Sequence, residues 1–307
     1  MRSIKENMRL LFSSASVPAR QDFHAVLYND LKYVTRRNVL TETLLHDEAP
    51  GITADHSLDH DIVVSLTSYG RRIHEVALTI ESLMQQTMKA NRIVLWLAED
   101  LAGQELPKAL VLQQKRGLEI KYCKDIRSYK KLIPQLKESP DDAIITADDD
   151  VLYDYDVLEH LIMAHQKQPE QILCCRARII LFDNNGSLLP YNQWPLVSRE
   201  EGREARLFLT GIGGILYPPH CFDEEVFNER VFLSLCPNAD DAWFTAMAIN
   251  KGITINKVFT RDEYGEDYIS IPSPLEQGLA ASNLGQERND AQICAVFSKY
   301  ALFDKLR

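Results

Sequence analysis

The sequence lacks the motifs of the most common cofactor and metal sites. No CxxC pair occurs among its six cysteines, and none of its eight histidines forms an HxH or HExxH motif. A structural zinc site and a histidine-rich catalytic zinc site therefore find no support. GxGxxG and GxxxxGK[ST] are also absent, so the fingerprints of the usual dinucleotide-binding fold and of the P-loop are missing.

Long apolar runs are missing as well. The longest uncharged run, from Leu207 to Phe222, is broken by glycines and prolines, so no segment reads as a membrane-spanning helix. The N-terminus starts with basic residues, but Arg9 interrupts its apolar stretch and makes it a poor signal peptide. Several cysteines sit inside apolar runs, which predicts buried free thiols in a reducing compartment. We expect a cytoplasmic protein.

The chain has no excess of positive charge. Its formal net charge is −10 and its pI is about 5.3, which argues against sequence-independent binding to nucleic acid. An acidic protein that binds phosphates needs a metal ion or a local group of Lys and Arg side chains to offset the repulsion. With 45% hydrophobic and 25% charged residues, the composition is that of a globular protein.

Residues 1–60 form a helical extension and linker in this interpretation. Apolar residues recur at helical spacing in residues 4–12, with basic residues on the other faces. Such a helix either packs on its own domain or lies on an anionic membrane, which would bring the protein to the inner face of that membrane. A second helix is expected over residues 21–45, and residues 50–60 read as a polar linker.

From Asp61 the pattern alternates between strands and helices. The expected strands are 62–66, 92–97, 118–122 and 143–147, and the expected helices are 74–86, one opening at Pro107, and 129–138. This order predicts βαβ units and a mainly parallel sheet. The second half is more mixed, with helices at 155–168 and 239–250, strands at 172–175 and 253–259, and Gly252 as a helix stop. We assign 61–265 to the main α/β domain and 266–307 to a C-terminal loop and closing helix.

Three consecutive carboxylates, Asp148, Asp149 and Asp150, end the apolar run from Ala143 to Ala147. In open α/β sheets, ligands bind at the carboxyl ends of strands. Hard divalent cations are held there by one or two carboxylates together with substrate phosphates. The alternative for this triplet is a solvated acidic turn after a strand.

Asp240 and Asp241 form a second acidic cluster at the start of a predicted helix. Carboxylates at this position cap free backbone N–H groups, which is one interpretation of the pair. The other is a general base that removes the proton from a sugar hydroxyl as it attacks an activated carbon.

Further candidate residues lie in loops. Hydroxyl groups and backbone N–H groups after the first strand suit a nucleotide base or ribose, and nearby basic residues suit a diphosphate. These nucleotide-binding candidates are Thr67, Ser68, Tyr69, Arg71, Lys130 and Lys131, with Arg72 beside them. Tyr191 and Trp194 can stack on sugar faces or plug the core. Gly213 and Gly214, like Gly211, permit close approach of a substrate to the backbone or form a bulge.

The ordered set of these segments resembles the family 2-like nucleotide-sugar glycosyltransferases with the GT-A fold, of the bacterial surface-polysaccharide type. The resemblance spans roughly residues 60–260. It rests on the first strand, a Thr-Ile-x-Ser-Leu-x-x-Gln-Thr segment at 79–87, the strand at 92–97, the DxD-type triplet, the glycine segment at 211–214 and Asp240-Asp241. It implies a mixed, mainly parallel α/β sheet flanked by helices.

The resemblance also implies roles for individual residues. Asp148 matches the first DxD aspartate, which contacts ribose or metal, and Asp150 matches the ligand of Mn²⁺ or Mg²⁺. Asp149 is placed with the nucleotide-sugar-binding residues, with a structural role expected. Asp241 matches the base of inverting members, and Asp240 stands where the family usually has Glu. The sequence departs from some related enzymes in having no histidine after His220.

The sequence therefore predicts a metal-dependent, inverting glycosyltransferase. A nucleoside-diphosphate sugar, expected to be a UDP-sugar, would be the donor, and a saccharide or lipid-linked molecule the acceptor. Two alternatives stay open: a nucleotidyltransferase, and a catalytically inactive partner in a polysaccharide-assembly complex. Donor sugar, acceptor and linkage are not encoded in these patterns.

Overall fold

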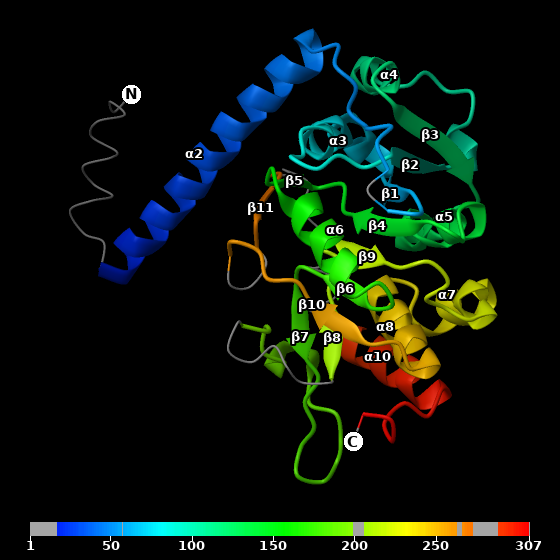
Figure 1. Cartoon of the computed structure of the whole chain (residues 1–307). Helices are drawn as coiled ribbons and strands as arrows, with labels where there is room; N and C mark the ends of the chain where they lie inside the picture. Colours follow the sequence, from blue (N-terminus) through cyan, green and yellow to red (C-terminus); the bar gives the residue numbers. More distant parts are fainter. Residues whose placement is uncertain (1–16, 57, 199–205, 263–265, 273–287, 307) are drawn as a thin grey trace.

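The computed structural model describes residues 17–56, 58–198, 206–262, 266–272 and 288–306. Within these residues the central sheet has seven strands in the order β10-β6-β9-β4-β1-β2-β3 (Figure 1). Its strands are β1 (Ile62–Thr67), β2 (Arg92–Ala98), β3 (Leu118–Cys123), β4 (Ala143–Ala147), β6 (Ile172–Cys174), β9 (Ile215–Tyr217) and β10 (Ile255–Lys257). β9 runs antiparallel to both neighbours, and all other pairs are parallel. The predicted mixed, mainly parallel α/β fold is confirmed.

The remaining elements surround this sheet. The helices are α2 (Val17–His46), α3 (Val76–Met84), α4 (Lys108–Gln114), α5 (Ile133–Glu138), α6 (Val157–Lys167), α7 (Glu229–Leu235), α8 (Asp240–Lys251) and α10 (Arg288–Lys299). Two short antiparallel pairs join β5 (Val151–Tyr153) to β11 (Tyr268–Ser270) and β7 (Ala177–Ile179) to β8 (Leu207–Leu209). Two 3₁₀-helices matter for the site, η1 (Gly70–His74) and η3 (Arg127–Lys131). The predicted helix at residues 1–12 lies outside the described residues.

The alternating pleat of the strands divides the core into two layers. In β4, Ile144 packs with α5, α8 and α10, while Ile145 packs with α3 and α6. The same alternation separates Ile215 from Leu216 in β9. Because successive strand residues point to opposite faces, both faces must be apolar to be covered by helices. The sheet is therefore the middle of three layers.

Two predicted helices differ from the observed ones. The helix expected at 129–138 is divided into η3 and α5, with Pro134 in the first turn of α5. Proline cannot donate a backbone hydrogen bond and is tolerated only at a helix start, so it forces the new beginning. The helix expected at 74–86 likewise begins as η1. Gly252 ends α8 in the left-handed conformation with φ of +82°, as predicted.

The chain order of the strands creates a switch point beside β1. The chain proceeds from β1 through β2 to β3 at one edge, and β4 then pairs on the opposite side of β1. Leu66 of β1 and Ala147 of β4 are register partners, so both strands end side by side. Connections that leave in opposite directions open a crevice at this carboxyl edge.

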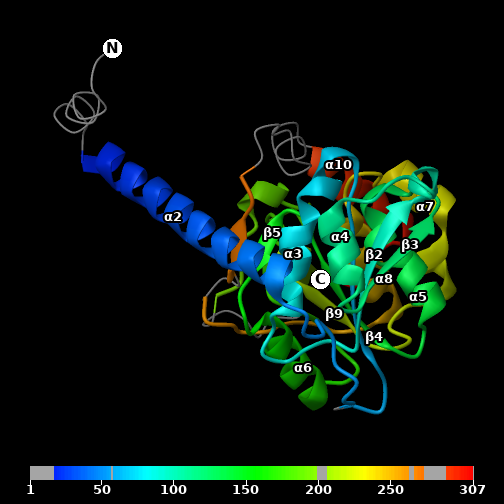
Figure 2. The ribbon, with the colours of Figure 1, turned by 90° about the horizontal axis from the view of Figure 1, so that it is seen from above.

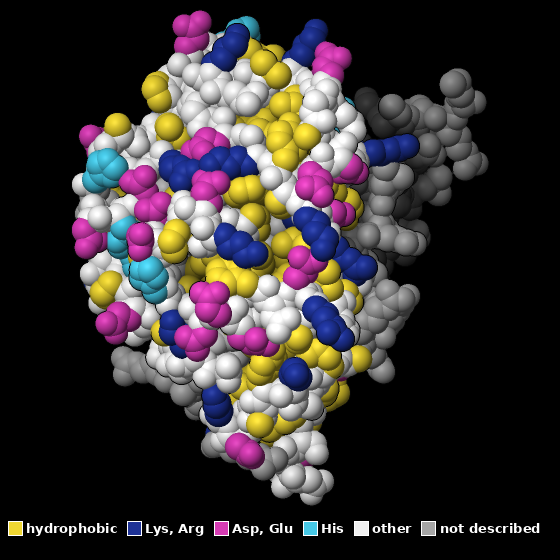
Figure 3. Space-filling model, turned by 90° about the vertical axis from the view of Figure 1, so that its right-hand side faces the viewer, with side chains coloured by type: hydrophobic (Ala, Val, Ile, Leu, Met, Phe, Trp, Pro, Cys, Tyr) yellow, Lys and Arg dark blue, Asp and Glu magenta, His cyan; other side chains and the backbone are white. Residues whose placement is uncertain are grey.

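The outer edge of the sheet at β3 is protected by charge. Arg92 of β2 makes ion pairs with Glu119 on β3 and with Glu138 at the end of α5, both at 2.7 Å, and Lys121 on β3 also pairs with Glu119. The hydrogen bond from Arg92 lowers the pKa of Glu119 against the effect of burial. Basic and acidic side chains are interspersed over this side of the molecule (Figure 3). Charged side chains on an edge strand oppose pairing with another chain.

The six cysteines are free thiols, and Cys174, Cys175, Cys221 and Cys236 are buried. This confirms the predicted buried thiols, although Cys294 is exposed. Burial raises the pKa of the Cys174 thiol to about 12, which keeps it protonated and unreactive.

Among the helices of the described residues, none combines the length and apolar character needed to cross a bilayer.

A buried ion pair ties the linker after α2 to the main domain. Arg116 Nη1 lies 2.9 Å from both carboxylate oxygens of Glu81 on α3, and Glu81 is fully buried. The Arg116 guanidinium also donates to Ala49 O at 2.8 Å, and the backbone carbonyl of Arg116 accepts from the Gly51 N–H at 2.8 Å. One guanidinium thus holds α3 and the linker together.

Replacing Glu81 by alanine should strongly destabilise the fold, because it leaves the Arg116 guanidinium buried without its partner. We expect the free energy of unfolding to fall by about 3–5 kcal/mol in urea denaturation. The exposed Glu48 provides a matched control, whose alanine variant should stay within about 0.5 kcal/mol of the wild type. Equal effects of both substitutions would show that the buried pair contributes little.

Candidate functional site

A cavity of about 610 Å³ opens at the carboxyl edge of β1 and β4. It is lined by Thr67 at the end of β1, by residues that follow other strands, among them Asp125, Asp148 and Arg176, and by Asp241 at the start of α8. Its volume lies within the range of small-molecule sites. The two acidic clusters that are about ninety residues apart in the sequence therefore share one cavity.

Lys131 joins the two acidic clusters. Its Nζ lies 2.9 Å from Asp148 Oδ1 and 3.1 Å from Asp240 Oδ2, and its side chain is 8% exposed. Burial alone would lower the pKa of Lys131, but Asp148, Asp240 and Asp241 together raise it well above the usual value. The ammonium group is therefore a permanent cation at the centre of the site.

The backbone around Lys131 is fixed from two sides. Ser65 Oγ on β1 donates to Lys131 O at 2.6 Å, and Tyr129 Oη donates to Cys236 O at 2.6 Å. Arg127 opens η3 with φ of +62°, a left-handed conformation that is strained for a residue with a side chain. Such strain persists only where surrounding contacts determine the conformation, and it gathers at functional sites.

The three aspartates of the triplet have different surroundings. Asp149 is buried, accepts from Ser68 Oγ at 2.6 Å and pairs with Arg72 at 3.0 Å. Burial raises the pKa of Asp149 to about 6, although Ser68 and Arg72 act in the opposite direction. The side chain of Asp150 is 40% exposed and lies 3.0 Å from the same Arg72 nitrogen. Asp149 thus anchors the turn, while Asp148 and Asp150 line the cavity with free capacity to accept.

Asp148 and Asp150 have the chemistry of a divalent-cation site. Burial and the neighbouring Asp148 carboxylate raise the pKa of Asp150, which means that the two negative charges repel each other. A cation between them would relieve this repulsion. No cluster of three or more His, Cys, Asp or Glu side chains suited to a metal occurs in the part of the chain that the structure describes. The donor set fits Mg²⁺ or Mn²⁺, which complete their shell with substrate phosphates and water.

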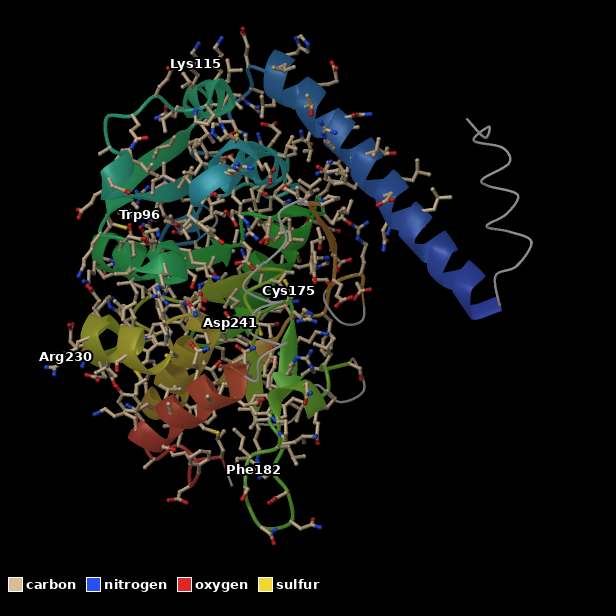
Figure 4. All side chains as sticks on the ribbon, turned by 180° about the vertical axis from the view of Figure 1, so that it is seen from behind. Trp96, Lys115, Cys175, Phe182, Arg230 and Asp241 are labelled. Atoms are coloured by element: carbon tan, nitrogen blue, oxygen red, sulfur yellow. The ribbon has the colours of Figure 1, made fainter. Side chains whose placement is uncertain are left out.

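Asp240 and Asp241 are oriented by neighbours outside their own helix. Asp240 Oδ1 accepts from Ser128 Oγ at 2.9 Å, and Asp241 Oδ2 accepts from the Gly211 N–H at 2.9 Å. Asp241 lies at the start of α8, at the end of this helix near the strands of the sheet (Figure 4). Burial, followed by the Asp240 charge, raises the pKa of Asp241 to about 7. The start of α8 therefore presents a carboxyl group that can exchange a proton near neutrality.

Gly211 allows the close approach of these groups. A Cβ atom at this position would lie 3.0 Å from Asp241 Oδ1 and 3.0 Å from Lys131 Nζ. A side chain here would require the carboxylate or the ammonium to move. Gly213 and Gly214 have φ of +96° and +104° and form the turn into β9. Neither lines the cavity among the described residues, so they shape the turn rather than contact an acceptor.

Several predicted binding residues do reach the cavity. Thr67, Tyr69, Lys130 and Tyr191 line it together with the acidic clusters. Thr67 Oγ1 donates to Trp96 O at 2.8 Å, and Tyr69 is 52% exposed. The Lys130 ammonium is paired with Asp125, so it contributes less free charge than predicted.

Three predicted residues do not suit the roles given to them. Trp194 is 1% exposed and its indole N–H donates to Leu189 O at 2.9 Å, so it belongs to the core and offers no face to a sugar. Ser68 is buried against Asp149 and acts on the triplet rather than on a nucleotide. Arg71 is exposed outside the cavity lining, whereas its neighbour Arg72 reaches the site.

Other cavity residues were not predicted. Arg176 and Arg178 both line the cavity, and the Arg178 guanidinium lies 5.0 Å from the centre of the Tyr191 ring. Their spacing could have predicted that both side chains lie on one side of the sheet, because residues i and i+2 of a strand share one face. Arg127 donates to Asn238 Oδ1 at 2.8 Å. No local sequence pattern predicts that Arg127 reaches the cavity, because Asn238 lies in a distant loop.

No protein family model matches the sequence, and no curated protein matches it either. Solved structures do match, and one of them is CMP:2-keto-3-deoxy-manno-octonic acid synthetase complexed with CTP. The match has 12% sequence identity and a TM-score of 0.41, and covers 74% of this chain and 100% of that chain. At this identity and score the likeness assigns neither an activity nor a ligand to the protein.

Proposed function

We propose that the protein is an inverting glycosyltransferase that moves a sugar from a nucleoside-diphosphate sugar to a saccharide or lipid-linked acceptor. The observation that carries this proposal is the meeting of the two acidic clusters around Lys131 in one cavity at the carboxyl edge of the sheet. One cluster supplies ligands for a cation on the donor. The other supplies a carboxyl group whose pKa of about 7 suits general-base catalysis.

The donor would lie across the ends of β1 and β4. Thr67 and Tyr69 line the part of the cavity that suits the nucleoside, and Arg72 lies beside Asp150 where a diphosphate needs positive charge. Asp148 and Asp150 are the residues that would hold Mn²⁺ or Mg²⁺. Such an ion would supply Lewis-acid neutralisation of the charge that develops on the leaving nucleoside diphosphate.

Asp241 is the better candidate for the base. The Asp240 carboxylate is engaged by both Ser128 and Lys131, whereas Asp241 is held by one backbone N–H and has a raised pKa. In the proposed step, Asp241 removes the proton of the acceptor hydroxyl while its oxygen bonds to the anomeric carbon. The bond from that carbon to the diphosphate breaks, and the nucleoside diphosphate leaves with the electron pair.

A nucleotidyltransferase is the second candidate, and the basic side chains of the cavity favour it. Arg72, Arg176, Lys130 and Lys131 are paired with carboxylates, whereas Arg127 and Arg178 line the cavity without an ion pair to any described residue. Their charge would be available to the additional phosphate of a nucleoside triphosphate. Product analysis separates the two, since the first reaction releases a nucleoside diphosphate and the second releases pyrophosphate.

Replacing Asp241 by asparagine should reduce kcat/KM about 10²–10⁴-fold, because the amide cannot take the acceptor proton. The variant should be at least as stable as the wild type above pH 7, where the partly buried carboxylate is charged at a cost. Asp100→Asn, an exposed site, is the matched control and should leave turnover unchanged. Full activity of Asp241→Asn in a folded protein would overturn the role of this residue.

The rate should rise with pH through about 7 and then level off, because only the ionised Asp241 accepts a proton. The folded-state pKa lies above the unfolded value of about 3.9, so the folded state binds more protons between the two values. This group therefore lowers stability as pH rises from about 4 to about 7. Kinetic pH profiles and denaturation at several pH values should agree, and a flat profile from pH 5 to 9 would contradict both.

Mn²⁺ and a nucleoside diphosphate together should raise the melting temperature of the wild type. At a ligand concentration of about 100 Kd the stabilisation is about 2.7 kcal/mol. Asp150→Asn should remove most of this shift, and Asp100→Asn should retain it. A full shift in Asp150→Asn, with UDP as the probe, would show that Asp150 is no ligand of the ion.

A further inference from the structure

Helix α2 is attached to the domain by one side of its C-terminal half. It is 30 residues long and projects well past the body (Figures 1 and 2). Tyr33 and Leu40 pack with Leu152 of β5, and Leu44 joins the core around α3. Arg36 lies over the Tyr155 ring at 3.7 Å. These contacts define the inner face of the helix.

The outer face of α2 carries an exposed apolar stripe. Leu27, Leu31, Val34 and Leu45 are 53%, 62%, 46% and 55% exposed. At 3.6 residues per turn they lie roughly a third of a turn around the helix from Tyr33, Leu40 and Leu44. The steps from Leu27 to Leu31 and to Val34 are four and three residues, and the next step of four reaches Asn38. This is the alternation of d and a positions in a heptad.

We propose that α2 pairs with α2 of a second copy of the chain in a parallel two-stranded coiled coil. Leu27, Val34 and the half-buried Thr41 occupy d positions, and Leu31, Asn38 and Leu45 occupy a positions. A single polar Asn at an a position is the device by which coiled coils fix a parallel two-stranded register. Asn38 is exposed, so its side chain is free to meet its symmetry mate.

The charges that flank the stripe match this arrangement. In this register, Arg37 occupies the g position of one heptad and Glu42 the e position of the next. In a parallel dimer, g and the next e of the other helix face each other, so Arg37 would pair with the partner's Glu42. Arg37 and Glu42 are both exposed. The two-fold axis therefore relates two identical ion pairs.

The position of the body relative to α2 leaves room for this dimer. The body of each copy packs on the inner face of its own α2, and the stripe faces away from it. A two-fold axis along the outer face would put the two bodies on opposite sides of the paired helices. This inference does not depend on the proposed enzymatic activity, because none of its residues lines the cavity.

Sedimentation equilibrium of the full chain up to high micromolar concentration tests the proposal. The wild type should approach twice the 35.1 kDa of one chain. Leu31→Glu/Val34→Glu should be monomeric throughout, with an unchanged far-UV spectrum because both side chains are exposed in the single chain. Lys32→Glu, an exposed charge change outside the stripe, is the control and should dimerise like the wild type.

Charge reversal tests the register. Arg37→Glu and Glu42→Arg should each raise the dimer Kd about tenfold, because each places like charges opposite one another twice. The double variant should recover the wild-type Kd, since the pair is restored with exchanged signs. A monomeric wild type, a dimer that survives Leu31→Glu/Val34→Glu, or no recovery in the double variant would each overturn the proposal. A monomer that binds phosphatidylserine vesicles through the stripe would identify a membrane as the occupant instead.

Discussion

The candidate site depends on one buried ammonium group. Lys131 lies within ion-pair distance of Asp148 at the end of β4 and of Asp240 at the start of α8, and the charge of Asp241 also acts on it. Without this cation, several carboxylates would face one another in a partly dehydrated cavity. Uncompensated buried charges cost several kcal/mol each, so the cation allows the acidic residues to converge while remaining charged.

Neighbouring residues hold the Lys131 side chain in this position. Ser65 on β1 holds the Lys131 carbonyl, and Tyr129 ties η3 to the loop before α8. Gly211 leaves room for the ammonium and the Asp241 carboxylate and also donates its N–H to that carboxylate. Three elements that are distant in the sequence are thus held in one geometry. Rigid support of this kind is what a catalytic carboxyl group needs to keep a raised pKa.

Periodicity and composition predicted much of the fold. Strands such as β1 and β4 are apolar and β-branched because they are buried on both faces, and their sequence signal is correspondingly strong. Asp148 and Asp150 could be placed at the carboxyl edge because they directly follow a predicted parallel strand. Asp241 was grouped with them only through the family resemblance, since it begins a helix. Trp194 could not be placed, since an aromatic residue in a loop looks the same whether it plugs the core or stacks on a ligand. Lys131 was identified as a candidate, but its bridging position depends on the Pro134 break and on long-range packing that no local pattern records.

The most direct test of the central claim is a ¹³C NMR titration of the aspartate side chains. A carboxyl signal should titrate near pH 7, well above the usual aspartate range, and should be absent from the Asp241→Asn variant. That result would establish that burial beside the Asp240 charge creates a base adapted to neutral pH. If every aspartate titrates below about pH 5, or if the signal near pH 7 persists in the variant, the claim is wrong.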